Sequence, residues 1–419
     1  MRMITYKNCE EQIIIVLPEV LSSENAEELE LELVELINEI DDKELVLDAD
    51  KLKYMSLKVV RGLFAILRKK SNVRIINVYP NIYEILDTVG ITTIALVEKK
   101  LKYIDVDNLE LLGVGMYGFV YRIDEDYILK VFKDQFSKEY LEKKILALKH
   151  AFLEGIPTIL SFEVVETRKG LGVIYELLDS ECLSTIIHKN PAMMDKYAKK
   201  FVDVAKQFAT VKLQEGVLTQ YKTVIKDELN TVRDLITSEE YEILLKYLDA
   251  VPDRSTVIHG DCQPSNIMML REELIFIDMD DFACGHPIWD VAVMYRSYQL
   301  MANPEKSDAD KFLVGKPYGS YEEFYSKIHK MDIIEAGRLW NLYFKYYFDG
   351  YTEQEQNAIL ELIEFYAQFI IIRTLLNVAN RSRSKSEIQK VKLEHSREYM
   401  ERMKQKDFDE IVKLFEVWR

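Results

Sequence analysis

The 419-residue chain is poor in the residue types that build metal sites and disulfide frameworks. Its four cysteines, Cys9, Cys182, Cys262 and Cys284, contain no Cys-x-x-Cys pair, and no His/Cys cluster has the spacing of zinc ligands. A structural zinc site and a disulfide-stapled fold are therefore not expected. Four reduced thiols fit a protein of the cytoplasm.

The chain also has fewer basic residues than acidic ones. The chain has 55 Lys and Arg against 71 Asp and Glu, a formal net charge of −16. Proteins that bind nucleic acid need a basic face for the phosphates, so no nucleic-acid partner is expected. The balance is compatible with a cationic substrate, but it is also common among cytosolic proteins.

Long apolar runs are missing as well. The first residues carry no apolar stretch of the kind found in signal peptides, and the tract Phe369–Val378 is interrupted by Arg373 and is too short to span a bilayer. We expect a cytoplasmic protein with no membrane partner. At 48% hydrophobic residues the chain can form large cores, and its length allows two or three domains.

Strand and helix patterns alternate in the first hundred residues. Apolar runs at 12–17, 45–47 and 73–78 predict strands, and helical spacing predicts helices from Ser22 or Ser23 to Ile40 and from Ser56 to Lys70. Strands alternating with helices indicate an α/β unit with a largely parallel sheet.

Residues 1–103 resemble the STAS domain, the anti-anti-sigma-factor module. The resemblance rests on Val46-Leu47-Asp48, on Tyr54-Met55-Ser56 before a helix, and on Ile82 to Gly90. In switching members a phosphorylated serine opens the second helix, but here Leu57 follows Ser56. The resemblance therefore implies a protein-docking or packing module, with Ser56 as an N-cap or, alternatively, an acceptor.

Three glycines open the second part of the chain. Gly113, Gly115 and Gly118 form a Gly-x-Gly-x-x-Gly pattern, which dinucleotide-binding folds also use. Here a strand and not a helix is predicted to follow, so the glycines should form a hairpin. Lys130 then lies inside the strand 127–132. A glycine hairpin with a lysine strand indicates the phosphate-holding half of a kinase-like fold.

Two further features of that half follow in sequence. A helix is predicted from 137 to 153, and such a fold expects one of its glutamates to pair with Lys130; Glu142 is the choice and Glu139 the rival, although both could be solvated helix charges. Glu176, Leu177 and Leu178 stand where the nucleotide-binding hinge is expected. Val120, Ile128 and Ile277 would sandwich the adenine, or serve as plain core residues.

The most specific pattern is His259-Gly260-Asp261-x4-Asn266, followed by Ile277-Asp278 and Trp289-Asp290. It is similar to the aminoglycoside phosphotransferase and choline kinase branch of the kinase superfamily, over residues 107–380. The resemblance implies ATP and Mg²⁺ as cofactors, Asp261 as catalytic base, and Asn266 and Asp278 as Mg²⁺ ligands. His259 would hold the loop, and Asp290 would brace it or act as an N-cap.

These patterns predict an α/β STAS-like domain (1–103) and an α+β bilobal kinase-like domain. The bilobal domain has an antiparallel-sheet N-lobe with hinge (104–178) and a mainly helical C-lobe (179–419). Only twelve positions separate Asp278 from Asp290, which leaves no room for a peptide-binding activation loop. The predicted acceptor is a hydroxyl of a small molecule of the aminoglycoside or choline-like class.

Two alternatives stay open. One is a nucleotide-binding pseudokinase that signals to a protein partner through residues 1–103; the other, protein kinase activity, is opposed by the short span. Seven aromatic residues could hold an amine by cation–π contact, although most should be core; they are Trp340, Tyr343, Phe344, Tyr346, Tyr347, Phe348 and Tyr351.

Overall fold

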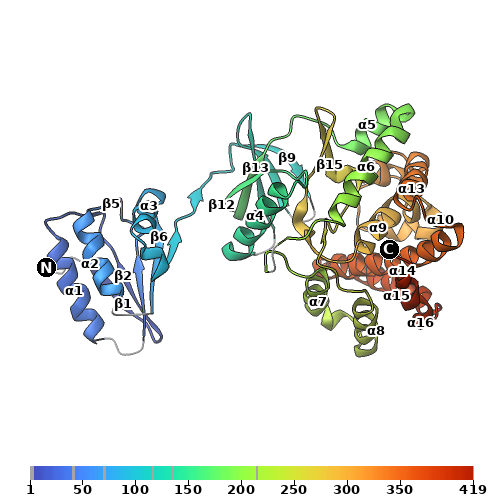
Figure 1. The fold of residues 1–419 in the computed structure, drawn as a ribbon. Helices are drawn as coiled ribbons and strands as arrows, with labels where there is room; N and C mark the ends of the chain where they lie inside the picture. Colours follow the sequence, from blue (N-terminus) through green and yellow to red (C-terminus); the bar gives the residue numbers. More distant parts are fainter. Residues whose placement is uncertain are drawn as a thin grey trace. The chain divides into compact units, whose positions relative to one another are not determined.

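The computed structural model describes residues 4–39, 43–68, 72–115, 118–133, 136–213 and 216–418. It divides into two compact units, residues 1–108 with 164–172, and residues 109–163 with 173–419 (Figure 1). Across these described ranges, every helix is too short or too polar to cross a bilayer.

The first unit contains a five-stranded sheet in the order β1-β2-β4-β6-β7. Its strands are β1 (Thr5–Asn8), β2 (Gln12–Val16), β4 (Glu44–Asp48), β6 (Val73–Val78) and β7 (Leu96–Lys99). The neighbours β2, β4, β6 and β7 are parallel, as the alternation of elements predicts. The antiparallel edge strand β1 was not predicted, because all four of its residues are exposed and show no alternation.

Three helices accompany this sheet: α1 (Ala26–Glu39), α2 (Leu57–Leu67) and α3 (Pro80–Thr88). Helix α1 packs against α2 (Figure 1). The Ser56 hydroxyl accepts the Val59 N–H at 3.4 Å, so the N-cap interpretation is confirmed. The predicted helix ends at Ile40 and Lys70 lie outside the described residues. Short strands β3 (Val20–Leu21), β5 (Tyr54–Met55) and β8 (Lys102–Tyr103) and a 3₁₀ turn (Ile91–Thr93) complete this part.

The second unit begins with a sheet in which β12, β13, β11, β10 and β9 are successive neighbours. The strands are β9 (Glu110–Val114), β10 (Gly118–Arg122), β11 (Tyr127–Phe132), β12 (Ser161–Thr167) and β13 (Gly170–Glu176). Strand β10 pairs antiparallel with both β9 and β11, so the glycines do form a hairpin. Helix α4 (Lys138–Leu153) follows β11, and the Ser137 hydroxyl caps it through the Tyr140 N–H.

The rest of the second unit is mainly helical, which fits a bilobal kinase-like domain. Its helices are α5 (Leu183–Lys189), α6 (Met194–Phe208), α7 (Tyr221–Thr231), α8 (Ser238–Asp249), α9 (Ile288–Tyr295), α10 (Pro304–Ser307), α11 (Ala309–Leu313), α12 (Tyr321–His329), α13 (Ile333–Tyr347), α14 (Glu353–Arg381), α15 (Ser386–Lys404) and α16 (Phe408–Lys413). Its strands are β14 (Val257–Ile258), β15 (Ile267–Leu270), β16 (Glu273–Phe276) and β17 (Ala283–Cys284). A π-helical segment, Arg296–Leu300, extends α9. Short 3₁₀ turns lie at Pro191–Met193, Arg233–Leu235, Pro264–Asn266, Met279–Asp281 and Leu414–Glu416.

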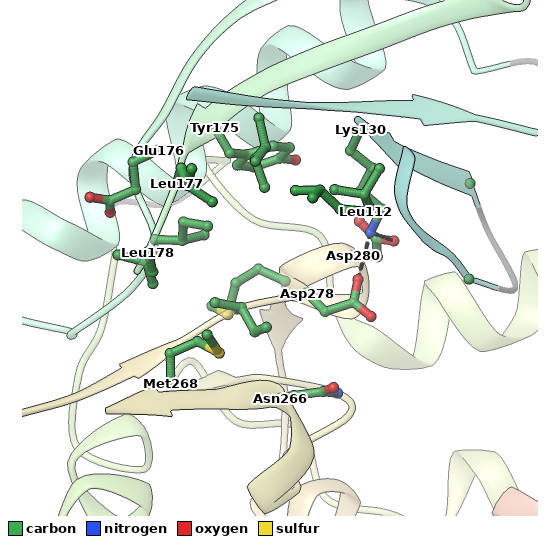
Figure 2. A pocket seen from close by; sticks show the side chains of 17 residues that line it. Leu112, Lys130, Tyr175, Glu176, Leu177, Leu178, Asn266, Met268, Asp278 and Asp280 are labelled. Atoms are coloured by element: carbon green, nitrogen blue, oxygen red, sulfur yellow. Dashed lines mark hydrogen bonds and ion pairs between the residues drawn. The ribbon is translucent and has the colours of Figure 1, made fainter. Parts of the chain in front are cut away.

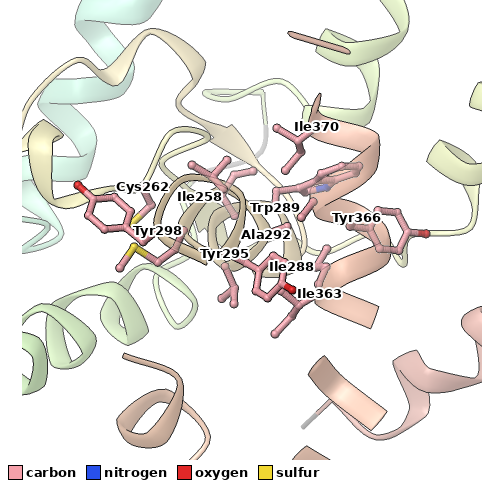
Figure 3. Close-up of a cluster of buried hydrophobic side chains, with 14 of the residues drawn as sticks. Ile258, Cys262, Ile288, Trp289, Ala292, Tyr295, Tyr298, Ile363, Tyr366 and Ile370 are labelled. Atoms are coloured by element: carbon pink, nitrogen blue, oxygen red, sulfur yellow. The ribbon is translucent and has the colours of Figure 1, made fainter. Parts of the chain in front are cut away.

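The core of this helical lobe surrounds α9 (Figure 3). Trp289 and Tyr366 are fully buried, and their rings meet edge to face at 5.5 Å across the packed helices α9 and α14. Ile258 and Cys262 belong to the same cluster. Burial raises the pKa of the Cys262 thiol well above its usual range, as expected for a packed and not a reactive cysteine. The segment 257–262 is thereby anchored on the rigid centre of the lobe.

Candidate active site

His259 holds the loop that follows β14. Its Nε2 donates to the Ile277 carbonyl at 3.0 Å, and its Nδ1 accepts the Asp261 N–H at 3.2 Å. The ring is fully buried. These contacts tie the start of the loop to the segment leading to Asp278, so the structural role expected for His259 is confirmed.

Asp290 fixes the same loop from α9. One of its carboxylate oxygens accepts the His259 N–H at 2.9 Å and the other accepts the Gly260 N–H at 2.7 Å. Asp290 is the third residue of α9, so it braces the loop and is not the N-cap of the helix. Burial raises the pKa of Asp290 to about 6, against the opposing effects of His259 and the two backbone N–H groups.

The braced loop presents Asp261 and Asn266 together. Asp261 Oδ2 accepts from Asn266 Nδ2 at 2.8 Å and from Gln263 Nε2 at 3.0 Å, and Asn266 Nδ2 also lies 3.0 Å from the Asp261 carbonyl. The other oxygen, Oδ1, lies 3.6 Å from Nη2 of Arg296. One carboxylate oxygen is therefore fixed by amides, while the other faces a guanidinium.

Asp278 lies just beyond β16 in the left-handed region, with φ 57°. Its Oδ1 accepts from Lys130 Nζ at 2.5 Å, and the same Nζ lies 2.6 Å from Asp280 Oδ2 (Figure 2). Burial lowers the pKa of Lys130, but the charges of Asp278 and Asp280 outweigh it and raise the pKa above its ordinary value. Lys130 is thus a permanently charged group in the site.

The expected pair between Glu142 and Lys130 is wrong in this structure. Glu142 Oε1 lies 3.7 Å from Lys138 Nζ, one helical turn away, and its side chain is about half exposed. Lys144 on the same helix donates to the Asp280 carbonyl instead. Two positions along a helix rotate a side chain by roughly 200°, so Glu142 and Lys144 project to opposite sides of α4.

A cavity of about 310 Å³ lies between the sheet and the loop. Nine of the residues predicted to contact the nucleotide line it: Gly115, Gly118, Val120, Ile128, Lys130, Glu176, Leu177, Leu178 and Ile277. Asn266 and Asp278 lie on its other side (Figure 2). Neither Gly113 nor Glu142 is among the lining residues. Gly113 pairs with Val120 within the hairpin instead.

Sequence reasoning missed several residues of this cavity, among them Leu112, Ile159, Tyr175, Met268, Met279 and Asp280. The apolar ones give no signal that separates them from core residues. Asp280 stands two positions after Asp278, and this short spacing is the one feature of the sequence that could have indicated its place beside the cavity.

The hinge offers backbone groups at one end of the cavity. The Leu177 N–H donates to the Asp126 carbonyl at 2.6 Å, and Glu176 Oε1 accepts the Leu160 N–H at 2.7 Å. No described residue accepts the Leu178 N–H, and Leu178 lines the cavity. The hinge is therefore held in place by its neighbours, while the Leu178 N–H is not used within the described residues.

Gly118 packs closely against strand β11 within the glycine hairpin. A Cβ at this position would lie 2.4 Å from the Val131 carbonyl oxygen. The Gly115 N–H donates to the Gly118 carbonyl at 2.9 Å, which closes the loop. The tip residues Met116 and Tyr117 lie outside the described part of the chain.

A second cavity, of about 260 Å³, lies on the other side of Asp261. Asp261, Gln263 and Arg296 are in its wall, with residues of α12 and α14. Because Asn266 lines the first cavity and hydrogen-bonds to Asp261 in the wall of the second, the loop joins the two spaces. Arg296 was not foreseen, since an arginine just after an apolar helix has no distinctive pattern.

The oxygen atoms beside the first cavity suit Mg²⁺. Asn266 uses its Nδ2 on Asp261, which leaves its amide oxygen, and Asp278 supplies a carboxylate. Mg²⁺ prefers hard oxygen ligands and is commonly held by one or two side chains together with nucleotide phosphates. The residues present therefore fit the ion.

Residues 115–316 match the phosphotransferase enzyme family. The chain also resembles solved structures. An ADP-bound aminoglycoside phosphotransferase, APH(2'')-Ib, is 14% identical with a TM-score of 0.46, covering 76% of this chain and 96% of its own. A choline/ethanolamine kinase family protein from Mesorhizobium loti is 14% identical with a TM-score of 0.38, covering 73% and 91%. No curated protein matches the sequence.

Proposed function

We propose that the second unit is an ATP- and Mg²⁺-dependent phosphotransferase that acts on a hydroxyl group of a small molecule. The observation that carries the proposal is the position of the loop 259–266 between two cavities. Its Asn266 reaches the cavity that contains Lys130 and the hinge, and its Asp261 reaches the other. Transfer between two substrates requires such a shared boundary.

Each residue then has a definite task. The hinge backbone orients the base, and Lys130 with the N–H groups of the glycine hairpin holds the phosphates. Asn266 and Asp278 hold Mg²⁺, which offsets charge on the phosphates when bound. Asp261 Oδ1 accepts the proton of the acceptor hydroxyl, while the amides on Oδ2 keep the carboxylate in position.

A pseudokinase is the second candidate, and one observation favours it. Lys130 is paired with Asp278 and Asp280, where the resemblance leads us to expect a glutamate of α4 as its partner. In this arrangement Lys130 occupies an oxygen of Asp278, which the proposed function assigns to Mg²⁺. A protein that binds nucleotide in this state without transferring phosphate would signal through residues 1–103.

The test separates the two candidates. Mg-ATP binding is measured by calorimetry, and ADP release is followed across a panel of hydroxyl compounds for wild type and Asp261→Asn. We expect both proteins to bind Mg-ATP, and Asp261→Asn to lose about 100-fold or more in kcat, because a general base contributes that much. Binding without turnover on any acceptor would support the pseudokinase, and absence of binding would refute both.

We also propose that residues 1–103 form a STAS-like docking module without a phosphoswitch. The parallel strands β2, β4, β6 and β7 and their helices support this proposal. The Ser56 hydroxyl is buried and occupied in capping α2, while the neighbouring Leu57 is 66% exposed. Incubation with a protein kinase followed by mass spectrometry checks it; stoichiometric phosphate on Ser56 would overturn it.

A further inference from the structure

The second cavity, which Asp261 faces, is lined by more cationic side chains than carboxylates. Four cationic side chains line it, Arg296, Lys316, Arg373 and Lys392, against two carboxylates, Asp261 and Asp281. An acceptor bound there meets this charge at close range. Which of the cations are already neutralised by the protein decides what the cavity can bind.

Arg373 is neutralised within the fold. Its Nε and Nη2 donate to the two oxygens of Glu228, its Nη1 donates to the Tyr221 hydroxyl, and Nη2 lies 3.5 Å from Asp281 Oδ1. Burial raises the pKa of Asp281, although the Arg373 charge opposes this. Arg373, Glu228 and Asp281 therefore form a structural ion-pair network, which leaves three cations facing Asp261 alone.

Lys392 is the most deeply buried of these three cations. It comes from α15, is 2% exposed, and donates from Nζ to the carbonyls of Lys311 and Phe312 at 2.5 and 3.2 Å. Among the described residues it has no carboxylate partner. An ammonium group carries three N–H donors, so one remains for a ligand. A buried cation without a counter-ion is costly, and an anion in the cavity would remove that cost.

The other two cations approach from separate segments. Lys316 follows α11, is exposed, and has no carboxylate partner among the residues described; its charge helps burial to lower the pKa of Lys392 to about 8. Arg296 begins the π-helical segment and uses Nε and Nη2 on the Ser297 hydroxyl, and the same Nη2 lies 3.6 Å from Asp261 Oδ1. Its Nη1 donates to no described residue.

An unpartnered histidine stands in the same wall. His329 is 2% exposed, and neither ring nitrogen has a hydrogen-bond partner among the described residues. Burial and the nearby charge of Arg296 lower its pKa to about 3, so the ring is neutral and has one N–H to donate. A ligand rich in oxygen atoms would accept that N–H. A ligand amine beside His329 would be repelled by the nearby charge of Arg296, and the carboxylates of this wall, Asp261 and Asp281, already face Arg296 and Arg373.

We propose that the acceptor is an anionic hydroxyl compound whose carboxylate or phosphate group is bound by Arg296, Lys316 and Lys392. This inference rests on the proposed function in one respect, namely that the acceptor hydroxyl is directed toward Asp261. It excludes the aminoglycoside or choline-like class expected from the sequence. The positions of the aromatic residues that could have held an amine also disfavour a cationic acceptor. None of four buried ones lines either cavity: Trp340, Tyr343, Tyr347 and Phe348.

Binding to the full chain, with the nucleotide cavity first saturated with Mg-ADP, tests the inference without turnover. Calorimetry compares glucuronate, glucose and glucosamine, which share a ring and differ in charge, and adds inorganic phosphate as a probe of the anion alone. We expect glucuronate or phosphate to bind, and glucosamine to bind at least about tenfold more weakly than glucuronate, as charge-assisted hydrogen bonds require.

Variants then assign the site. Lys316→Gln should weaken anion binding about tenfold, and Lys316→Glu should abolish it, whereas Lys327→Gln, an exposed lysine on α12 that does not line the cavity, should leave it unchanged. Lys392→Met removes another of the three cations and should also weaken anion binding. Anion binding that survives in Lys316→Glu, tighter binding of glucosamine, or no binding of either anion would overturn the inference.

The two failures are distinguishable. A protein that binds anions in this cavity but transfers no phosphate contradicts the proposed function and leaves the anion site intact. A protein that phosphorylates a neutral or cationic acceptor retains its proposed function and refutes the anion site.

Discussion

Lys130 and Asp278 stand 148 positions apart in the sequence and form a 2.5 Å ion pair in the site. The pair joins strand β11 to the segment after β16. In the proposed function both residues act on the same bound group, the nucleotide phosphates with their cation. This relationship gives the first of four predictions.

Lys130→Met should weaken Mg-ATP binding by about tenfold or more, because a buried charge-assisted contact to phosphate is lost. It also leaves Asp278 and Asp280 facing each other without a cation, which opposes binding of the anionic phosphates further. Calorimetric titration with Mg-ATP measures the effect. Lys189→Met, at an exposed lysine paired with Glu181, is the matched control and should bind as the wild type does. Equal affinities in the two variants would refute the role of Lys130.

Gly260→Ala should destabilise the helical lobe by about 3 kcal/mol or more. The residue has φ 83°, and an added Cβ would lie 2.5 Å from Asp281 Cβ and 2.6 Å from the Asp281 carbonyl oxygen. Backbone strain and a clash against backbone both contribute. Denaturant titration followed by tryptophan fluorescence reports on this lobe, since Trp289, Trp340 and Trp418 all belong to it.

The control for this clash is Gly350→Ala. Gly350 has φ 89° but nothing within 4 Å of an added Cβ, so only the conformational cost of roughly 1–2 kcal/mol applies. A loss at Gly260 no larger than that at Gly350 would show that the loop tolerates displacement from Asp281.

Asp290→Asn should lower kcat while changing the affinity for Mg-ATP little. An asparagine oxygen can still accept one of the N–H groups of His259 and Gly260, but its amide nitrogen then faces the other N–H. We expect a loss of about 1–3 kcal/mol in the free energy of unfolding. Chemical denaturation and steady-state kinetics measure the two effects, with the exposed Asp310→Asn as control. Unchanged stability and kcat would contradict the bracing role.

Acid should destabilise the helical lobe through three buried histidines. Burial lowers the pKa of His286 and His329 to about 3 and that of His395 to about 4, while the unfolded chain has a value near 6.5. Below about pH 6.5 the unfolded state binds protons that the folded state does not. The free energy of unfolding should then fall by roughly 1.4 kcal/mol per pH unit for each histidine, until the folded pKa is reached.

His286→Asn checks the assignment. Asparagine Oδ1 can replace Nδ1, which accepts the Ile288 N–H at 3.1 Å, but it does not titrate. The variant should lose roughly a third of the slope from these histidines between pH 6.5 and 4, and differ from wild type by a constant amount above pH 7. An unchanged slope would show that His286 is protonated in the folded state or does not contribute.

The sequence by itself determined the local elements and the order of the site motifs. The apolar run at residues 127–132 predicts the strand that carries Lys130, and the strand after Gly118 separates a hairpin from a dinucleotide-binding loop. Ser56 caps its helix as its position predicts, and the helix predicted from residue 137 begins directly after Ser137. All these features depend on neighbours within a few residues, and such neighbours are visible in a single sequence.

Only the tertiary structure decided which charges meet. Glu142 was chosen as the partner of Lys130 by its place on α4, but the packing of that helix turns Lys144 toward Asp280 instead. Arg296 and Lys392 reach one cavity from a π-helical segment and from α15. Each is an ordinary polar residue in its own stretch of sequence. In the proposed anion site their charges act together because packing places distant segments in the wall of one cavity, and Coulomb energies grow as the distance between charges falls.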